Sequence, residues 1–468
     1  MAWFNKRQAQ PSLPRGRRSL PLLGQTLAFH GQAHDEVCSL VHDVNCSTVR
    51  LSVLARDVAL ITSYDDALQV LDQPWSPSEK ETSRTKAYEQ LMAAFFSPPN
   101  LLLEDEDEEE AKEHRQAWDA CMNPSPDGAQ RAASSIVADW TANLAKQNEV
   151  DIYEACKSLG QSLALGTFLG LARGTTEFDE AQAWSEDMLR GQFSLPVGFK
   201  TPLYQNAFSR GQDAKRRFDA MVQQRMAAGS CPFSERAKDT GIADASNASH
   251  HAMFSSNLVV KAFASLAAAL VLQLYRQQPG QATLAERIRS LATDEAEGVI
   301  SAVVTETERV SPPIIGVMRT VVKDEGLSLH RAGVCIPRGW DAWPYLPLAN
   351  RDEAAFGPDA ACFRWDRYRN GKGSHDGCKQ PLTFGAGVKP CGGSAIIRSW
   401  LRGVAMRLIS TRISLNFAEE DLGAGVQDWL GWYDQPSNAG KRATWRGSVK
   451  QLPTQRPHKG ILVVIAES

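Results

Sequence analysis

Hydrophobic positions recur every three to four residues along most of the chain, which is the period of an amphipathic helix. This pattern is clearest over residues 132–226 and in SAIIRSWLRGVAMRLIS, residues 394–410. The run 257–280 is apolar nearly all round and ends at a Pro-Gly pair, so it predicts a buried central helix. The polar, glycine-bearing stretch 229–251 before it is predicted to be a loop.

Two short runs near the N-terminus have a different character. TVRLSVL (48–54) and DVALITS (57–63) are rich in β-branched residues and are followed by the helical pattern YDDALQVLDQ (64–73). They predict a β-hairpin that leads into a helix. The acidic run 104–114 is predicted to be a solvated loop or the start of a helix, because so many like charges cannot be buried. The whole pattern predicts a mainly α protein with a small β-rich part.

Composition narrows the function classes. The 468 residues are 43% hydrophobic and 22% charged, which is ordinary for a globular enzyme. The net charge of −3, without a basic stripe, gives no electrostatic basis for nucleic-acid binding. The nine cysteines include no CxxC pair that would indicate zinc or a redox dithiol, and they favour a reducing compartment. The N-terminus lacks an apolar run of signal-peptide or membrane-span length, so we expect an intracellular protein, soluble or peripherally membrane-associated.

The segment TFGAGVKPCGG, residues 383–393, places Cys391 among four glycines. Its pattern Phe-Gly-x-Gly-x-x-x-Cys-x-Gly resembles the haem-ligand loop of the cytochrome P450 family, which implies haem b bound through Cys391 as thiolate. A loop beneath a flat ring must keep side chains away from it, which glycines allow. The helix that follows would point its positive end at the sulfur and favour the thiolate. The resemblance assigns to cofactor binding Phe384, Gly385, Gly387, Lys389, Cys391 and Gly393.

A second motif lies upstream in the family's order. Glu306 and Arg309 in ETER are three residues apart, on one face of a helix. In the family this pair is buried and completed by a later arginine, which Arg367 of FRWDRY matches. The resemblance therefore implies a buried structural network of these three residues.

The haem propionates need cationic or hydrogen-bonding partners when they are buried. By position, Arg319, Lys389 and His114 match the family's propionate-binding residues. Trp118 stands where the family often has a second basic group, so that contact departs from the pattern.

The central helix departs from the family at the proton relay, an acid or amide followed by a threonine. Counting back from the end of the helix places these positions on Ala262 and Phe263, and neither side chain can pass a proton. A shift by one residue gives Lys261 with Ala262, or Phe263 with Ala264. The nearest hydroxyl is Ser265, which we expect to bond to the backbone of its own helix. The catalytic residues are therefore unknown, and these distal-helix residues are the candidates.

The resemblance implies a cytochrome P450-like fold, with a long central helix over the haem and the Cys-ligand loop beneath it. We expect residues 1–24 to form a basic, proline-rich tail and residues 25–468 a single catalytic domain. The leading expectation is monooxygenase-type oxidation of a small hydrophobic molecule, in secondary metabolism, with a separate reductase or ferredoxin as redox partner. One alternative is an enzyme that rearranges, dehydrates or uses a hydroperoxide without activating dioxygen; Lys261 could then hold an acidic substrate. Another is an inactive haem-binding relative. We expect a monomer.

Overall fold

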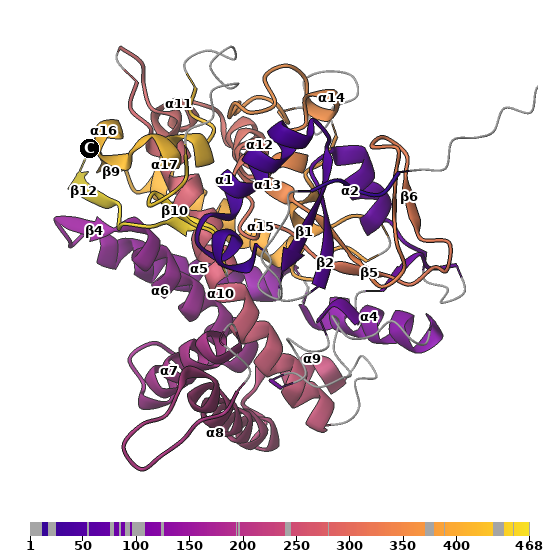
Figure 1. The fold of residues 1–468 in the computed structure, drawn as a ribbon. Helices are drawn as coiled ribbons and strands as arrows, with labels where there is room; N and C mark the ends of the chain where they lie inside the picture. Colours follow the sequence, from indigo (N-terminus) through magenta and orange to yellow (C-terminus); the bar gives the residue numbers. More distant parts are fainter. Residues whose placement is uncertain are drawn as a thin grey trace, which may run out of the picture.

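The computed structural model describes most of the chain: residues 12–16, 25–53, 56–74, 79–83, 86–88, 94–95, 108–122, 126–192, 194, 197–238, 245–278, 280–369, 379–387, 389–433, 444–452 and 454–467. A large helical part and a smaller β-rich part lie side by side (Figure 1). The mainly α architecture with small sheets is therefore confirmed.

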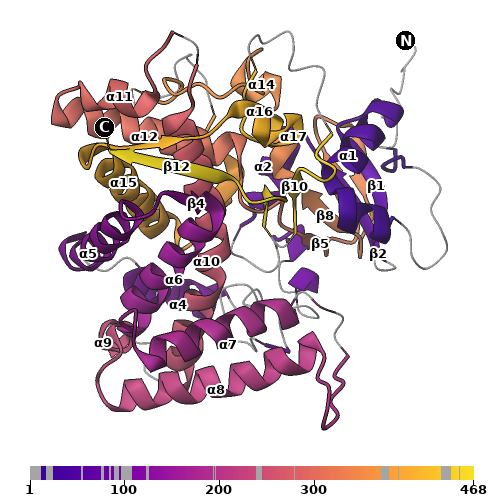
Figure 2. The ribbon, with the colours of Figure 1, turned by 90° about the vertical axis from the view of Figure 1, so that its left-hand side faces the viewer.

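The helical part is built around α10, which passes through its middle in both views (Figures 1 and 2). From Phe263 to Tyr275 this helix is almost wholly buried, because its side chains are apolar on every face. It packs most extensively against α6, and also against α8, α12 and α15. The helices of this part are α4 (Glu108–Met122), α5 (Pro126–Leu144), α6 (Ile152–Leu169), α7 (Thr176–Gln192), α8 (Ala207–Ala227), α9 (Pro232–Lys238), α10 (Ala245–Tyr275), α11 (Leu284–Arg289), α12 (Thr293–Val310), α15 (Ser394–Ser410), α16 (Glu419–Leu422) and α17 (Ala424–Trp429).

The main sheet has the strand order β1-β2-β8-β5-β3, and β2 pairs with β8 in parallel. The predicted hairpin is confirmed, since β1 and β2 pair antiparallel and α2 follows. The elements of the β-rich part are α1 (Thr26–Val44), β1 (Thr48–Val53), β2 (Arg56–Ile61), α2 (Tyr64–Leu71), β3 (Thr82–Ser83), β5 (Arg319–Val321), β6 (Leu327–Leu329), β7 (Val334–Ile336), β8 (Asp341–Pro344), α13 (Leu346–Ala349), α14 (Glu353–Phe356) and the 3-10 turn η1 (Leu382–Phe384).

A second sheet joins distant parts of the helical half, with β12 between β4 and β9. Its strands are β4 (Glu149–Asp151), β9 (Ile413–Asn416) and β12 (Leu462–Glu467). A separate two-stranded sheet pairs β10 (Val449–Lys450) with β11 (Arg456–Pro457). At the other end of the chain, Ser12 and Arg15 form bridges with Val334 and Val49. The division into a tail, 1–24, and one domain, 25–468, stays a prediction.

One element was mispredicted. The stretch 229–251, expected to be a loop, contains α9 and the first turns of α10. Pro232 occupies the first position of α9, where its missing N–H costs nothing. Cys231 and Phe233 are fully buried, and the Arg236 guanidinium donates to the Cys121 carbonyl at 2.8 Å. Burial against distant helices therefore stabilises a helix that the polar composition conceals.

Candidate functional site

Cys391 lies in a tight loop between η1 and α15. Its backbone N–H donates to the Phe384 carbonyl at 2.6 Å, which closes the loop, and α15 begins at Ser394. The cysteine is exposed, whereas Gly392 and Gly393 beside it are buried. Protein atoms crowd the rest of the thiol, and this burial raises the pKa of Cys391; the Gly393 backbone N–H and nearby guanidinium groups oppose the rise. The loop thus presents a cysteine at the start of a helix.

The glycines of the loop have more than one task. Gly385 and Gly387 have φ of 77° and 71°, a conformation that side chains other than glycine rarely adopt. A Cβ at Gly387 would collide with Asp72, and one at Gly392 would lie 2.7 Å from the Trp118 indole nitrogen. The glycines therefore fix the loop's own path and its packing, in addition to any room that they leave for a cofactor.

Helix α4 contacts the loop through a residue that sequence reasoning missed. The Arg115 guanidinium donates to the Pro390 carbonyl at 2.6 Å and to Asp119 at 2.8 Å. Its neighbour His114 was the residue predicted for a propionate; the His114 side chain lies outside the part that the structure describes. Arg115 directly follows His114 in the sequence, and its positive charge was the signal that could have identified it.

The other predicted propionate residues are half-buried. Arg319 begins β5 and donates to the Met318 carbonyl at 2.9 Å. Lys389 precedes the cysteine by two residues in the loop itself. Their role toward a cofactor stays a prediction.

Glu306, Arg309 and Arg367 meet in the core with fully buried side chains. The Glu306 carboxylate accepts from Arg309 at 2.7 and 2.8 Å and from Arg367 at 3.1 Å. Burial alone would lower the pKa of Arg367, but the carboxylates of Glu306 and Asp359 raise it above its ordinary value. Each guanidinium also donates to backbone carbonyls, so the network joins α12 to the segment 350–369.

Asn350 carries this network to the ligand loop. Its carbonyl accepts from Arg309 at 2.8 Å, and its side-chain amide binds the Leu382 N–H at 2.8 Å and the Thr383 hydroxyl at 2.9 Å. Leu382 and Thr383 begin the turn that leads into Phe384. The ion network therefore positions the loop through a buried asparagine that sequence reasoning missed.

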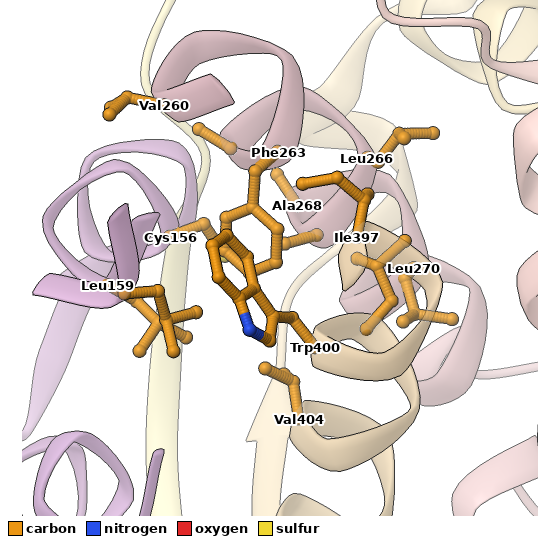
Figure 3. Packing of buried hydrophobic residues seen from close by; sticks show 14 of the residues in the cluster. Cys156, Leu159, Val260, Phe263, Leu266, Ala268, Leu270, Ile397, Trp400 and Val404 are labelled. Carbon is orange, nitrogen blue, oxygen red and sulfur yellow. The ribbon is translucent and has the colours of Figure 1, made fainter. Parts of the chain in front are cut away.

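Phe263 of the central helix points into the core of the helical part. Its ring is fully buried, 5.8 Å from the Trp400 ring of α15, and lies against Gly160 of α6. Figure 3 shows it within apolar side chains of these three helices. Phe263 is thus a core residue between three helices. Lys261 and Ala262 are only half-buried, and which of these positions stands where the family carries its proton relay stays a prediction.

Two polar side chains flank this position on α10. The Ser265 hydroxyl donates to the Gln455 carbonyl and not to its own helix, which corrects the expected back-bond. Lys261 faces a polar group in which Lys157 binds Glu186 at 2.8 Å. Burial, with the cations Arg456 and Lys157 nearby, lowers the pKa of Lys261 to about 8.

The residues present fit a haem. The loop offers an exposed cysteine at a helix N-terminus. Arg115 of α4, Arg319 of β5 and Lys389 of the loop supply cations. Among the residues that the structure describes, no group of three or more His, Cys, Asp or Glu side chains could hold a bare metal ion. A single exposed cysteine suits a metal that arrives in its own ring and takes one protein ligand.

Comparison with known proteins agrees with this geometry. The family model described as Cytochrome P450 matches residues 298–411. Cytochrome P450 714C2 of rice is 34% identical over 114 residues, 24% of this chain and 21% of that protein. Cytochrome P450 26B1 of Bos taurus is 23% identical over 291 residues, 56% of this chain and 55% of that protein. Retinoic acid-bound cyanobacterial CYP120A1 has the same fold, with a TM-score of 0.76 and 17% identity over 98% of this chain and 100% of that one.

These findings define the cytochrome P450 fold. Together they support a cytochrome P450 family protein, and the cofactor of that family is haem b. The aligned segments span about half or less of the two curated relatives, the rice and the Bos taurus proteins. Among the described residues, no helix is long and apolar enough to cross a membrane.

Proposed function

We propose that this chain is a haem-thiolate monooxygenase that inserts one oxygen atom of dioxygen into a small hydrophobic molecule. Two electrons from a separate redox partner and two protons reduce the other oxygen atom to water. The observation that carries the proposal is the exposed Cys391, held at the start of α15 by a loop that is hydrogen-bonded to the core. A thiolate ligand pushes electron density onto haem iron and thereby favours O–O cleavage.

The protein's own residues hold the site and shape proton access. Arg115 and Asn350 fix the two ends of the loop, and Gly385 allows its turn. On the central helix Ala262 has no proton to give, and the Ser265 hydroxyl is committed to a backbone carbonyl. Proton delivery in this proposal runs through water or a substrate hydroxyl. Arg319 and Lys389 are proposed to bind the propionates.

Turnover in two parallel reactions tests the reaction type. We expect product when a substrate, first shown to bind by a spin-state shift, is supplied with reductase, reduced nicotinamide and dioxygen. Ala262→Thr restores a hydroxyl at a half-buried position of α10, so it should change the fraction of reducing equivalents that reaches product. Product formed only anaerobically with a hydroperoxide, and unaffected by Ala262→Thr, contradicts a monooxygenase. No product in either reaction supports an inactive relative.

The second candidate is a hydroperoxide-using enzyme that acts on an acidic substrate. Lys261 favours it, because this half-buried cation stands beside Ala262 where the family carries its relay. The structural neighbour CYP120A1 is described as binding retinoic acid, a carboxylic acid. A carboxylate next to Lys261 would form a charge-assisted hydrogen bond in partly desolvated surroundings.

This candidate predicts a pH dependence of binding. Since burial lowers the pKa of Lys261 to about 8, its cation is present below pH 8 and lost as the pH rises through that value. An apolar carboxylic acid should therefore bind less tightly at pH 9 than at pH 7, by about tenfold. Its methyl ester should show no such change, and Lys261→Met should abolish the difference. Spin-state titrations measure each affinity, and equal pH profiles for acid and ester would exclude Lys261 as the anchor.

A further inference from the structure

A second ion pair, with a buried carboxylate and a partly buried guanidinium, lies beside the loop that carries Cys391, separate from the Glu306 network. Glu308 of α12 has a fully buried side chain and accepts three hydrogen bonds from Arg398 of α15. The Arg398 Nε lies 3.0 and 3.1 Å from the two carboxylate oxygens, and Nη2 lies 2.8 Å from Oε2. Such a two-pronged geometry fixes the orientation of the guanidinium. The pair joins two helices 90 residues apart in sequence.

Arg398 also covers the aromatic residue of the loop. Its guanidinium carbon lies 4.9 Å from the centre of the Phe384 ring, within the range of a cation–π interaction. The Phe384 carbonyl accepts the Cys391 N–H, and the Thr383 hydroxyl donates to the Glu308 carbonyl at 2.6 Å. Both members of the pair therefore contact the turn that carries Phe384 toward the cysteine.

Arg398 holds its positive charge beside the loop that carries Cys391. Its guanidinium lies over the Phe384 ring, and the Phe384 carbonyl accepts the Cys391 N–H, so the cation and the cysteine flank the same residue. A partly buried cation beside a thiolate ligand stabilises added negative charge, since screening by water is reduced there.

We propose that Glu308 and Arg398 are positioning residues for the Cys391 ligand. Glu308 orients Arg398, and Arg398 clamps the Phe384 ring and holds a positive charge near the sulfur, which raises the reduction potential of iron bound to it. This inference rests on the proposed assignment of Cys391 as the haem ligand. A pair that only joined α12 to α15 would stabilise the fold without moving the potential in a charge-dependent way.

The test measures the ferric–ferrous reduction potential of the haem-loaded protein by spectroelectrochemistry with redox mediators. Arg398→Met removes the cation and should lower the potential, by about tenfold in the ferric–ferrous equilibrium, or about 59 mV for one electron. Glu308→Gln leaves Arg398 without its counter-charge and should raise the potential. Arg398→Lys keeps the charge and should stay closer to wild type than Arg398→Met does. Arg407→Met, which removes an exposed arginine from the last turn of α15, is the matched control and should change little.

The results separate this inference from the proposed function. A wild-type protein without the red-shifted ferrous carbon monoxide band would show that Cys391 is not the ligand, and both proposals would fail together. With that band present, opposite shifts in Arg398→Met and Glu308→Gln support the positioning role. Equal potentials in all variants, or shifts of the same sign in both, overturn it. If Arg398→Met does not fold, Glu308→Gln and Arg398→Lys still decide the outcome.

Discussion

Cys391→Ser should abolish the strongly red-shifted Soret band of the ferrous carbon monoxide complex. The band depends on a thiolate opposite carbon monoxide, and a serine hydroxyl at this position neither ionises near neutral pH nor donates electron density as sulfur does. Because the side chain is exposed and its backbone N–H makes the loop's hydrogen bond, the substitution leaves the Phe384 contact intact. We therefore expect a folded protein that has lost its ligand chemistry, with turnover reduced to background.

A second cysteine provides the control for this experiment. Cys46 lies half-buried in the turn between α1 and β1, and Cys46→Ser makes the same chemical change away from the loop. Its spectrum should match wild type, and circular dichroism should show equal helix content in both variants. A red-shifted band that persists in Cys391→Ser would mean that another residue binds the iron, and the proposed site would be wrong.

The sequence predicted the elements whose stability is local or whose motif is contiguous. Residues 394–410 were predicted as a helix and form α15 with the same bounds, because the apolar stripe begins directly after the glycines of the loop. The glycine-framed cysteine and the Glu-x-x-Arg pair were visible because each motif is short. Their joint order along the chain identified the family.

Contacts between distant segments were beyond sequence reasoning. Helix α9 depends on burying Cys231 and Phe233 against helices that precede it by many residues. Asn350, which links the ion network to the loop, looks like an ordinary polar residue in its segment. Glu308 and Arg398 are 90 residues apart, with strands β5 to β8 of the β-rich part between them. No local sequence pattern indicates that they form a pair.

The sequence of the central helix does not by itself show which face Phe263 occupies. One residue of α-helix turns the side chain by about 100°, so a count that is off by one residue assigns a different face. Gly160 on α6 leaves room for the Phe263 ring, because a Cβ there would lie 2.9 Å from it. Packing against α6, and not the sequence of α10 alone, therefore determines which face of the central helix Phe263 occupies.

Glu306→Ala should destabilise the protein by about 3 to 5 kcal/mol, the cost of leaving buried charges without a partner. The substitution leaves the fully buried Arg309 without a carboxylate partner and leaves the fully buried Arg367 with Asp359 alone. Domains unfold with about 5 to 15 kcal/mol in total, so this loss removes a large share of the stability. The variant should express poorly and retain little haem, because the same network holds the ligand loop through Asn350.

Two further variants show whether the charge network is the cause. Glu297→Ala removes an exposed carboxylate from the same helix and should change stability by less than about 0.5 kcal/mol. Arg367→Met should also be costly, but less so than Glu306→Ala, since Glu306 keeps both hydrogen bonds from Arg309 and the Arg364 N–H. Thermal denaturation and the haem-to-protein absorbance ratio measure both effects. A soluble Glu306→Ala protein with wild-type melting temperature and full haem content would refute the view that this network supports the loop, because a buried Arg309 without its carboxylate partner must cost stability.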